Sequence, residues 1–385
     1  MDRAWELALT EATLRLCEAR TSDLAATTYE VPIDVYTDAG HAERERRLFR
    51  ALPMLAALSC ELREPGQFKA VTLSGTPLLI VRGRDGEARA FLNACRHRGM
   101  KLTEGRGAAA KITCPYHAWA YDDRGALVGV PRGPEGFPGL CREERSLVAV
   151  ASVERHGIVW VRLDGPADEA IDIDGFLGDF GPELARWDIA GWQYHDSRDH
   201  RPVANWKLTL EGYCENYHVA SLHPQSVALA SKAYGSHHVS FGDHQRLIMP
   251  NHEIDQLRDI PQDQWAPFGT GKFAFIYHIF PGTIFALFHD NYQVFQIFPG
   301  PTADTSVTLQ SVFTPTTISE EESASLKQRF AYFHSVVAGE DYAAVQRAQA
   351  TLETAANKTL VFGRQEIALH QLHRSCTRRI ASAAG

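Results

Sequence analysis

Two pairs of metal-ligand side chains lie close together in the chain. Cys95 and His97 form a Cys-X-His pair, and after sixteen intervening residues Cys114 and His117 form a Cys-X-X-His pair. Thiolates and imidazoles are the ligands that bind zinc and iron–sulfur centres in proteins. The stretch therefore predicts a metal centre that is held on two loops.

The order of these ligands favours an iron–sulfur cluster over zinc. A structural zinc finger usually groups like ligands, a cysteine pair and then a histidine pair, around one tetrahedral ion. Here each loop supplies one cysteine and one histidine, which suits a two-iron cluster in which one iron binds both thiolates and the other binds both imidazoles, the Rieske arrangement. We expect such a [2Fe-2S] cluster, and a structural zinc site is the alternative.

A second pair of histidines lies in the segment ENYHVASLHP, residues 215–224. On a regular helix His218 and His223 would point about 140° apart, because each residue turns the helix by about 100°. The two side chains converge only if the helix ends or loosens between them, and Pro224 makes such an ending plausible. Two imidazoles and one carboxylate form the facial triad that holds Fe(II) and leaves positions open for oxygen.

A carboxylate with no obvious partner lies in the segment GEDYAAVQRAQATLE, residues 339–353. Asp341 shares a helical face with the apolar residues Val345, Ala348 and Leu352. A carboxylate on an apolar stripe needs a partner, and an iron ion would be one. The neighbouring Glu340 is expected to point away into solvent.

Composition limits what surrounds these residues. The 385-residue chain is 44% hydrophobic and 22% charged, with a net charge of -8, so nothing suggests a nucleic acid or an anionic membrane as partner. The most apolar region, residues 273–298, is interrupted by polar residues and a Pro-Gly pair and cannot span a membrane. The N-terminus lacks the continuous apolar core of a signal peptide. Seven scattered cysteines without such a signal favour a reducing compartment and no disulfides.

The elements that must position the metal ligands change along the chain. Residues 1–60 look helical, with one helix at 41–55 that Pro53 ends or kinks. Residues 65–165 show short alternating runs, which predict hairpins around Asp85-Gly86 and Arg124-Gly125 and a closing strand in HGIVWVRLDG. This part is expected to be a small all-β domain with the Cys/His pairs on two of its loops.

A larger α+β region follows a Gly/Pro/Asp-rich connection at 164–182. It is expected to contain a helical segment at 206–223, aromatic strands at 273–313 and a helix from about residue 319. Ser319 opens that helix, and Glu322 lies in the register of a capping box. Strands followed by a long C-terminal helix suggest a sheet wrapped on a helix.

Three segments together carry a resemblance to a known family. The Cys/His signature, the segment NWKLTLEGYCENYHVASLHP and the segment around Asp341 resemble those of the Rieske non-haem iron oxygenases. The chain is identified as a member of the aromatic-ring-hydroxylating dioxygenase family, as a large (alpha) terminal oxygenase component. The resemblance implies an α+β fold with three parts: a helical segment at 1–40 that packs on the catalytic domain, an all-β Rieske domain at 41–165, and a catalytic domain of helix-grip (START-like) type at 166–385, with an antiparallel sheet and a long C-terminal helix.

The same resemblance implies a role for each site residue. The [2Fe-2S] cluster is bound by Cys95, His97, Cys114 and His117, and the mononuclear Fe(II) by His218, His223 and Asp341. Glu215 is the bridging carboxylate, which links an iron-ligating histidine to a Rieske histidine, His117, of a neighbouring subunit. Glu211 is its nearest competitor. Gly212 departs from the commoner pattern, in which many members carry asparagine, and the roles of Glu211, Gly212, His237 and His238 stay open.

The activity that the resemblance implies needs partner proteins. The chain is expected to use O2 and electrons relayed from NAD(P)H through a separate reductase, with or without a ferredoxin, to hydroxylate an organic substrate, expected to be aromatic. It shows no nicotinamide- or flavin-binding module of its own, because GRDGEAR lacks the glycine fingerprint. A cytoplasmic homotrimer is expected, and the sequence does not decide whether a β subunit joins it.

Two alternatives remain open at the level of the sequence. The first is a quaternary-ammonium or N-methyl Rieske monooxygenase, because that branch also uses a bridging glutamate and tyrosines can cage a cation. The second is a non-catalytic electron carrier with a degenerate second metal site. Aromatic residues of the strands would either line a substrate pocket or fill the core: Phe273, Phe275, Tyr277, Phe285, Phe288 and Phe295.

Overall fold

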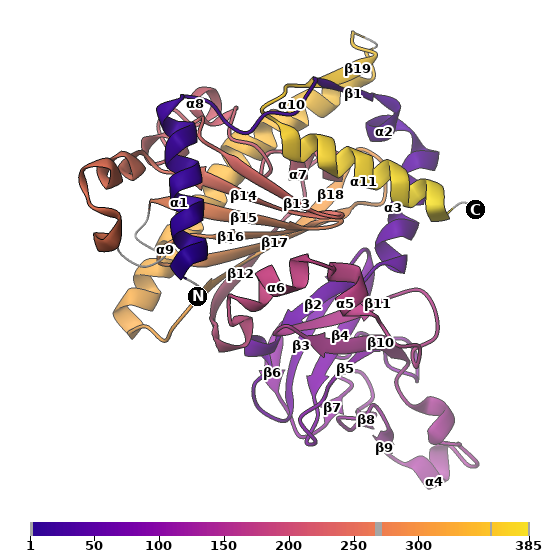
Figure 1. Ribbon diagram of the computed structural model, residues 1–385. Helices are drawn as coiled ribbons and strands as arrows, with labels where there is room; N and C mark the ends of the chain where they lie inside the picture. Colours follow the sequence, from indigo (N-terminus) through magenta and orange to yellow (C-terminus); the bar gives the residue numbers. More distant parts are fainter. Residues whose placement is uncertain (1–2, 266–271, 355, 384–385) are drawn as a thin grey trace. The chain divides into compact units, whose positions relative to one another are not determined.

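The structure is a computed structural model that describes residues 3–265, 272–354 and 356–383 (Figure 1). The chain forms two compact units, which are described separately. One comprises Phe49–Phe176 and Trp187–Gly191, and the other comprises Met1–Leu48, Leu177–Arg186 and Trp192–Gly385.

The smaller unit is built from two antiparallel sheets. The larger sheet has the spatial order β2 (Met54–Leu58), β11 (Ile158–Arg162), β10 (Ala149–Arg155), β5 (Ala88–Leu92), β4 (Thr76–Arg82), β3 (Gln67–Leu73) and β6 (Arg106–Ala108). The other sheet consists of β7 (Ile112–Thr113), β8 (Ala120–Tyr121) and β9 (Leu127–Gly129). Short helical turns connect the strands: η1 (Ser59–Glu61), α4 (Gly133–Gly136), η2 (Glu143–Arg145), α5 (Ile173–Leu177) and η3 (Ile189–Gly191).

Both predicted hairpins of this unit are confirmed. Strands β4 and β5 pair across the Asp85-Gly86 turn, and β8 and β9 pair across the Arg124-Gly125 turn. Gly125 has a φ of 80°, and a Cβ at this position would lie 2.6 Å from the ring of Phe91, so both conformation and space require glycine there. The predicted closing strand is β11.

The expectation of a wholly helical N-terminal segment is wrong in two places. Helix α3 (Ala39–Ala51) ends before Pro53, as predicted, but residues 54–58 form the buried strand β2 rather than the end of a helix. This strand pairs with β11 at the edge of the sheet. Its five consecutive buried residues are compatible with a buried strand as well as with a buried helix, so the pattern alone does not decide between them. Residues 29–32 also form a strand, β1 (Tyr29–Pro32), which pairs with β19 (Thr359–Phe362).

The larger unit is organised around one antiparallel sheet. Its spatial order is β12 (Gln193–His200), β18 (Ser306–Thr314), β17 (Tyr292–Pro299), β16 (Thr283–Leu287), β15 (Phe273–Ile279), β14 (His244–Pro250) and β13 (His237–Phe241). The β-branched and aromatic residues of β15–β18 are almost all buried, as expected for strands covered on both faces. His237 and His238, whose roles the sequence leaves open, lie in β13.

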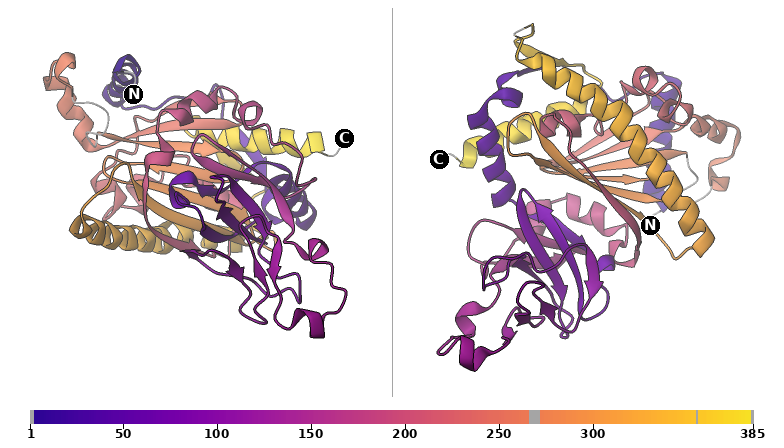
Figure 2. Two further views of the ribbon diagram at one scale, coloured as in Figure 1. Left: turned by 90° about the horizontal axis from the view of Figure 1, so that it is seen from below. Right: turned by 180° about the vertical axis from the view of Figure 1, so that it is seen from behind.

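Helices cover the two faces of this sheet (Figures 1 and 2). Helix α1 (Arg3–Glu18) lies over one face, where Trp5 contacts Phe275. The long run of α9 (Glu320–Val336), the π-helical turn η7 (Val337–Asp341) and α10 (Tyr342–Leu352) crosses the other face. The remaining helices are α2 (Asp34–Thr37), α6 (Phe180–Ala185), α7 (Trp206–Glu211), α8 (Val219–Leu222), η4 (Val227–Leu229), η5 (His252–Asp259), η6 (Gln262–Gln264) and α11 (Ile367–Ala383).

The predicted start of α9 is confirmed. The Glu322 amide donates to the Ser319 hydroxyl at 3.2 Å, and the Glu322 carboxylate accepts from the Ser319 amide at 2.8 Å, which completes a capping box. An antiparallel sheet followed by long helices is therefore present, as expected for a helix-grip domain. None of the described helices combines the length and the apolar character that crossing a membrane requires.

Candidate metal centres and substrate pocket

The two histidines of the second predicted site are brought together by a break in the chain. Helix α7 ends at Glu211, and α8 is a separate helix of four residues that begins directly after His218 and ends directly before His223. The predicted continuous helical segment at 206–223 is therefore interrupted, which is the condition that the two side chains needed in order to converge. Their ring centroids lie 5.2 Å apart.

Asp341 reaches the same point from the other end of the sequence. Its Oδ1 atom lies 3.1 Å from Nε2 of His223 and 3.6 Å from Nε2 of His218. One donor atom from each of the three residues lies within 4.8 Å of the others, and among the described residues this is the only group of three or more such side chains with that spacing. Two imidazoles and one carboxylate of this geometry can hold a mononuclear iron.

A glutamate holds the far nitrogen of each imidazole. Nδ1 of His218 contacts Oε1 of Glu215, whose carboxylate also accepts from the His218 amide at 3.1 Å. Nδ1 of His223 lies 2.5 Å from Oε2 of Glu340, which also accepts from the Ser226 hydroxyl at 2.7 Å. Carboxylates in this position fix the ring orientation of metal-ligating histidines and raise their basicity.

The expectation that Glu340 points into solvent is therefore wrong. On a regular helix its side chain would turn about 100° away from that of Asp341. The π-helical turn η7 widens the backbone at this point, and both acidic side chains reach His223. Hydrogen bonds from Ser226 and His223 lower the pKa of Glu340. Burial lowers the pKa of His223, but the hydrogen bonds and negative charges of Asp341 and Glu340 outweigh it, so the net shift is upward.

A cavity of about 390 Å³ adjoins the three residues. Strands β14–β17 supply one wall, with Met249, Ile276, Ala286 and Phe295, while helices α7–α11 and the segments that adjoin them supply most of the rest. Of the aromatic residues named from the sequence, Phe288 and Phe295 line the cavity, whereas Phe275, Tyr277 and Phe285 are buried without lining it. The described lining contains no lysine or arginine.

The acidic residues of this cavity lie close to the metal-ligand group. They are Glu211, Glu215, Asp341 and Glu366. Burial raises the pKa of Glu366, and the carboxylates of Glu215 and Glu211 raise it further. The cavity therefore combines an apolar body with a small number of carboxyl groups, a composition typical of small-molecule sites.

Other candidate residues lie elsewhere. Glu211 makes hydrogen bonds to Tyr36 and His373, so it does not occupy the place of Glu215 beside His218. His237 pairs with Asp23, and His238 bonds to Gln245, as expected for hydrogen-bonded rather than metal-ligating histidines. Cys214 is buried and Tyr217 is exposed. All seven cysteines are free, as predicted.

The first predicted metal site lies on two loops of the smaller unit. Cys95 and Cys114 are buried in its core, next to Trp119 and Tyr121, and the rings of His97 and His117 lie 4.7 Å apart between centroids. Trp119 stacks on His97 at the same distance with an interplanar angle of 8°. The two loops thus bring cysteines and histidines together as pairs.

The donor atoms of these four residues fit a two-iron cluster. Nδ1 of His97 is buried and has no hydrogen-bond partner among the described residues, which is costly unless the atom binds something. No three of the four residues place donor atoms within 4.8 Å of one another in the described part of the chain, as a single tetrahedral zinc ion would require. A cluster with its thiolates on one iron and its imidazoles on the other spaces the donors more widely.

Sequence reasoning missed Tyr121. Its hydroxyl lies 3.3 Å from Sγ of Cys95 and accepts from the Arg96 amide at 2.9 Å. Hydrogen bonds to cluster sulfurs tune the reduction potential of iron–sulfur centres. In the sequence, the sign of this role is the position of Tyr121 shortly after the second ligand loop, and this is a weak signal.

Comparisons with known proteins agree with these two sites. A model of the Rieske [2Fe-2S] domain matches residues 53–151, and a model of the ring-hydroxylating alpha subunit (catalytic domain) matches residues 189–382. The matched models indicate a [2Fe-2S] Rieske cluster and a mononuclear iron as cofactors.

Sequence relatives of the chain include subunits of known oxygenases. The chain is 32% identical over 203 residues to the biphenyl 2,3-dioxygenase subunit alpha of Rhodococcus jostii strain RHA1, which covers 51% of this chain and 44% of that protein. It is 31% identical over 219 residues to the glycine betaine monooxygenase oxygenase subunit of Chromohalobacter salexigens, covering 56% of this chain and 46% of the relative. The chain thus matches less than half the length of each of these relatives.

The fold as a whole is similar to a solved oxygenase. Naphthalene 1,2-dioxygenase from Rhodococcus sp., solved with bound indole, superposes with a TM-score of 0.75 at 18% identity, over 98% of this chain and 99% of that one. The predicted fold class, a Rieske domain followed by a helix-grip catalytic domain, is confirmed. Since the catalytic-domain model alone covers half of the sequence and the Rieske model precedes it, the chain belongs to the Rieske-type family of ring-hydroxylating alpha subunits.

Proposed function

We propose that this chain is the terminal oxygenase component of a multicomponent oxygenase. It uses O2 and electrons relayed from NAD(P)H through a reductase to hydroxylate an organic substrate at a mononuclear Fe(II). The observation that carries the proposal is the convergence of His218, His223 and Asp341 on one point at the edge of a 390 Å³ apolar cavity. These three residues would hold Fe(II), and a triad of this kind leaves coordination positions free for oxygen.

The proposal assigns the metal ligands residue by residue. Cys95, His97, Cys114 and His117 hold the cluster in a Rieske domain at 41–165. His218, His223 and Asp341 hold the iron in a catalytic domain at 166–385, on which residues 1–40 pack. Glu215 orients His218 and offers the electron path to that histidine from His117 of a neighbouring subunit. When bound, the two centres supply electron transfer and the reduction of O2.

The cavity supports a neutral, aromatic substrate. Most of its described lining is aliphatic or aromatic, and no lysine or arginine is present to pair with a substrate carboxylate. A buried, unpaired carboxylate is strongly disfavoured. An arene without acidic groups therefore fits this cavity better than an aromatic acid or a zwitterion such as a betaine.

The second candidate is a quaternary-ammonium or N-methyl monooxygenase. The related glycine betaine enzyme supports it, as do Tyr213 and Tyr342, which line the cavity together with four acidic residues. Aromatic faces and carboxylates attract a cation. The described lining offers no lysine or arginine to pair with the carboxylate of a betaine. For this second candidate, the lining therefore favours a cationic amine without a carboxylate as substrate.

The non-enzymatic alternative, a Rieske electron carrier, has less support. A carrier has no need of two glutamates that orient the imidazoles of a second metal site, yet Glu215 and Glu340 occupy those places beside His218 and His223. The same proposal includes a homotrimer in the cytoplasm, supplied by a separate reductase with or without a ferredoxin. Free cysteines and a cluster that must be loaded suit a reducing compartment.

A single-turnover experiment with isotopically labelled O2 tests the proposed function. The iron-reconstituted chain is reduced chemically, which removes the need for the reductase, and is mixed with neutral arenes, aromatic acids, betaines and methylamines. We expect label in the product of a neutral arene, with two labelled atoms for dioxygenation and one for monooxygenation. The His218→Ala variant, which keeps the Rieske ligands, is the control and should give no labelled product. Absence of label from every substrate with the fully loaded wild type would contradict the proposal.

A further inference from the structure

We propose that His373 and Glu211, held in place by Tyr36, form a proton path that connects a second, small cavity with the substrate cavity. The inference rests on the proposed function, because oxygenation consumes protons. Each turnover takes two electrons and two protons: dioxygenation puts both oxygen atoms into two product hydroxyls, and monooxygenation makes one hydroxyl and one water. The protons must reach a cavity whose walls are mostly apolar.

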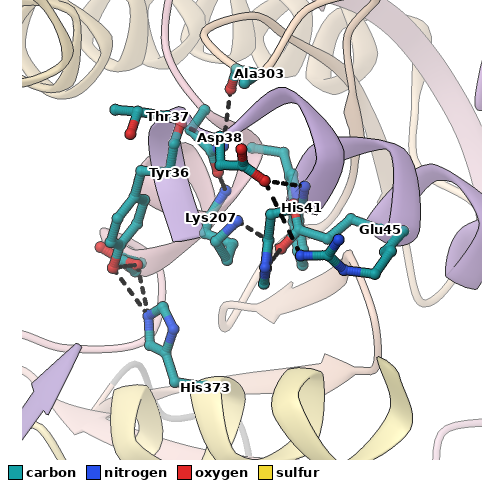
Figure 3. A network of polar contacts seen from close by, with 12 residues as sticks. Tyr36, Thr37, Asp38, His41, Glu45, Lys207, Ala303 and His373 are labelled. Carbon is teal, nitrogen blue, oxygen red and sulfur yellow. Dashed lines mark hydrogen bonds and ion pairs between the residues drawn. The ribbon is translucent and has the colours of Figure 1, made fainter. Parts of the chain in front are cut away.

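The three residues share hydrogen bonds although they lie far apart in the sequence. The Tyr36 hydroxyl donates to Oε1 of Glu211 at 2.8 Å, and Nε2 of His373 lies 2.9 Å from the same oxygen. The Tyr36 oxygen and Nε2 of His373 are 3.0 Å apart, and Figure 3 shows these two side chains pointing toward each other from α2 and α11. One carboxylate oxygen is therefore the meeting point of a phenol and an imidazole.

The two proton-carrying residues of this group line two different cavities. Glu211 lines the substrate cavity. His373 lines a second cavity of about 40 Å³, whose polar walls are formed by His41, Glu45 and Lys207. This volume holds one or two water molecules, and the site offers the several polar partners that a buried water needs.

The small cavity lies near the surface of its unit. Its lining includes the exposed residues Pro32 and Thr377, and the side chain of His41 is 18% exposed. Nε2 of His41 lies 3.1 Å from Glu45, which in turn pairs with Lys207 at 2.5 Å (Figure 3). A proton that enters from solvent can therefore reach titratable side chains of the small cavity.

The chemistry of the path balances at each step. An imidazole accepts a proton at one ring nitrogen and releases another from the second. His373 takes a proton from water in the small cavity and gives its Nε2 proton to Glu211. The carboxyl group of Glu211 then releases that proton to reduced oxygen in the substrate cavity and returns to a carboxylate. Tyr36 keeps its proton and holds Oε1 in place.

The charges around the group are consistent with these roles. Burial raises the pKa of Tyr36 well above its usual value, and the neighbouring Glu211 raises it further, so the phenol stays a donor. Glu45 and Cys376 also raise the pKa of Tyr36. Nζ of Lys207 lies 5.2 Å from the centroid of the Tyr36 ring. On the substrate side, burial and the carboxylates of Glu215 and Glu211 raise the pKa of Glu366, which lines the same cavity.

The first test measures single-turnover product formation in the reduced, iron-loaded chain, with a solvent isotope effect. Glu211→Gln keeps the shape of the side chain and His373→Gln keeps a hydrogen-bonding group, but neither amide can take up and release a proton. We expect product formation to slow by on the order of 100-fold, at unchanged metal content, with more hydrogen peroxide released per electron. Imidazole added to His373→Ala should restore the rate. Wild-type rates and isotope effects in both glutamine variants would overturn the path.

His370→Gln is the matched control. His370 lies on the same helix, is equally buried and donates from Nε2 to the Gly363 carbonyl at 3.0 Å, but it lines neither cavity. We expect its rate and peroxide release to match the wild type. A loss as large as that of His373→Gln would show a structural requirement of α11 and would overturn the path.

The second test does not depend on oxygenation. In the metal-free chain, NMR with labelled histidine follows exchange of the His373 Nε2 proton with solvent deuterium. Cys376→Met fills the small cavity from its wall and should slow this exchange without changing exchange at His370. Unchanged exchange at His373 would overturn the path. Failure of the loaded wild type to oxygenate any substrate would instead contradict the proposed function, since the exchange measurement still tests the path.

Discussion

At the scale of single residues, each histidine of the proposed iron site is held between two carboxylates. Nε2 of both imidazoles faces Asp341, while Nδ1 faces Glu215 in His218 and Glu340 in His223. Because the carboxylates fix the ring orientations before any metal arrives, the site is preorganised for a divalent ion. Glu215 and Glu340 are therefore expected to matter for metal binding as much as the residues that would coordinate the metal.

Glu340→Gln tests this arrangement. The amide retains a contact with Ser226 but no longer fixes the tautomer and basicity of His223, so the affinity for Fe(II) should fall by about 10–100-fold. Metal titration of the apo-protein measures the affinity. Glu353→Gln, an exposed glutamate at the end of α10, is the matched control and should bind iron like the wild type. Equal affinity in the Glu340 variant would contradict the role of this carboxylate.

Sequence patterns predict local ligand sets better than partners that depend on backbone irregularity. Each Cys/His pair lies within one loop, so spacing alone predicts Cys95, His97, Cys114 and His117 as ligands. Asp341 is predicted from the resemblance of its segment to the family and from its place on an apolar stripe. Glu340 was misassigned because a regular helix turns adjacent side chains apart, and the sequence gives no clear sign of the π-helical turn that brings both acids to His223.

At the scale of elements, helix ends and helix breaks position the site. The interruption between α7 and α8 brings His218 and His223 together, and the run from α9 through η7 to α10 delivers Asp341. The capping box at Ser319 satisfies amides at the start of this run. The stability of the long helix is therefore tied in part to one exposed serine.

Ser319→Ala should lower the free energy of unfolding by about 1 kcal/mol, because it removes the side-chain acceptor for the Glu322 amide. Urea-induced unfolding measures the change. Ser325→Ala, in the exposed interior of the same helix, is the control and should leave stability equal or slightly higher, since alanine has the better helix propensity. Equal stability of the Ser319 variant and the wild type would show that the cap contributes nothing measurable.

Elements with strong local signals were predictable, and one with an ambiguous signal was not. The two hairpins carry glycine turns, and α9 carries its cap, so each was correctly placed. Residues 54–58 form a continuous apolar run that suits a buried strand or a buried helix equally. Its pairing with β11, about a hundred residues later, decides between them, and no local pattern records that pairing.

At the scale of the whole molecule, a buried polar network joins α3 to α7 within the larger unit. Lys207 and Glu45 form an ion pair with side-chain exposures of 1% and 0%, and Glu45 also accepts from Nε1 of Trp206 at 2.8 Å. Removing one partner of such a pair leaves a buried charge without compensation. Glu45 and Lys207 lie 162 residues apart, so no local pattern in the sequence predicts this contact.

Lys207→Met should therefore lower the free energy of unfolding by about 3–5 kcal/mol. The double variant Lys207→Met, Glu45→Gln removes both charges and keeps an acceptor for Trp206, so it should recover more than half of the loss. A double-mutant cycle in urea measures both effects. Equal destabilisation in the single and double variants would mean that the cost comes from packing and not from the unpaired carboxylate.

The central claim is that the chain holds both a [2Fe-2S] cluster and a separate mononuclear iron. Iron, zinc and acid-labile sulfide are counted per chain in the anaerobically purified, iron-reconstituted wild type and in Asp341→Ala. Three irons to two sulfides are expected in the wild type, and two to two in the variant. A wild type with two irons and two sulfides would contradict the second site, and zinc without sulfide would contradict the cluster.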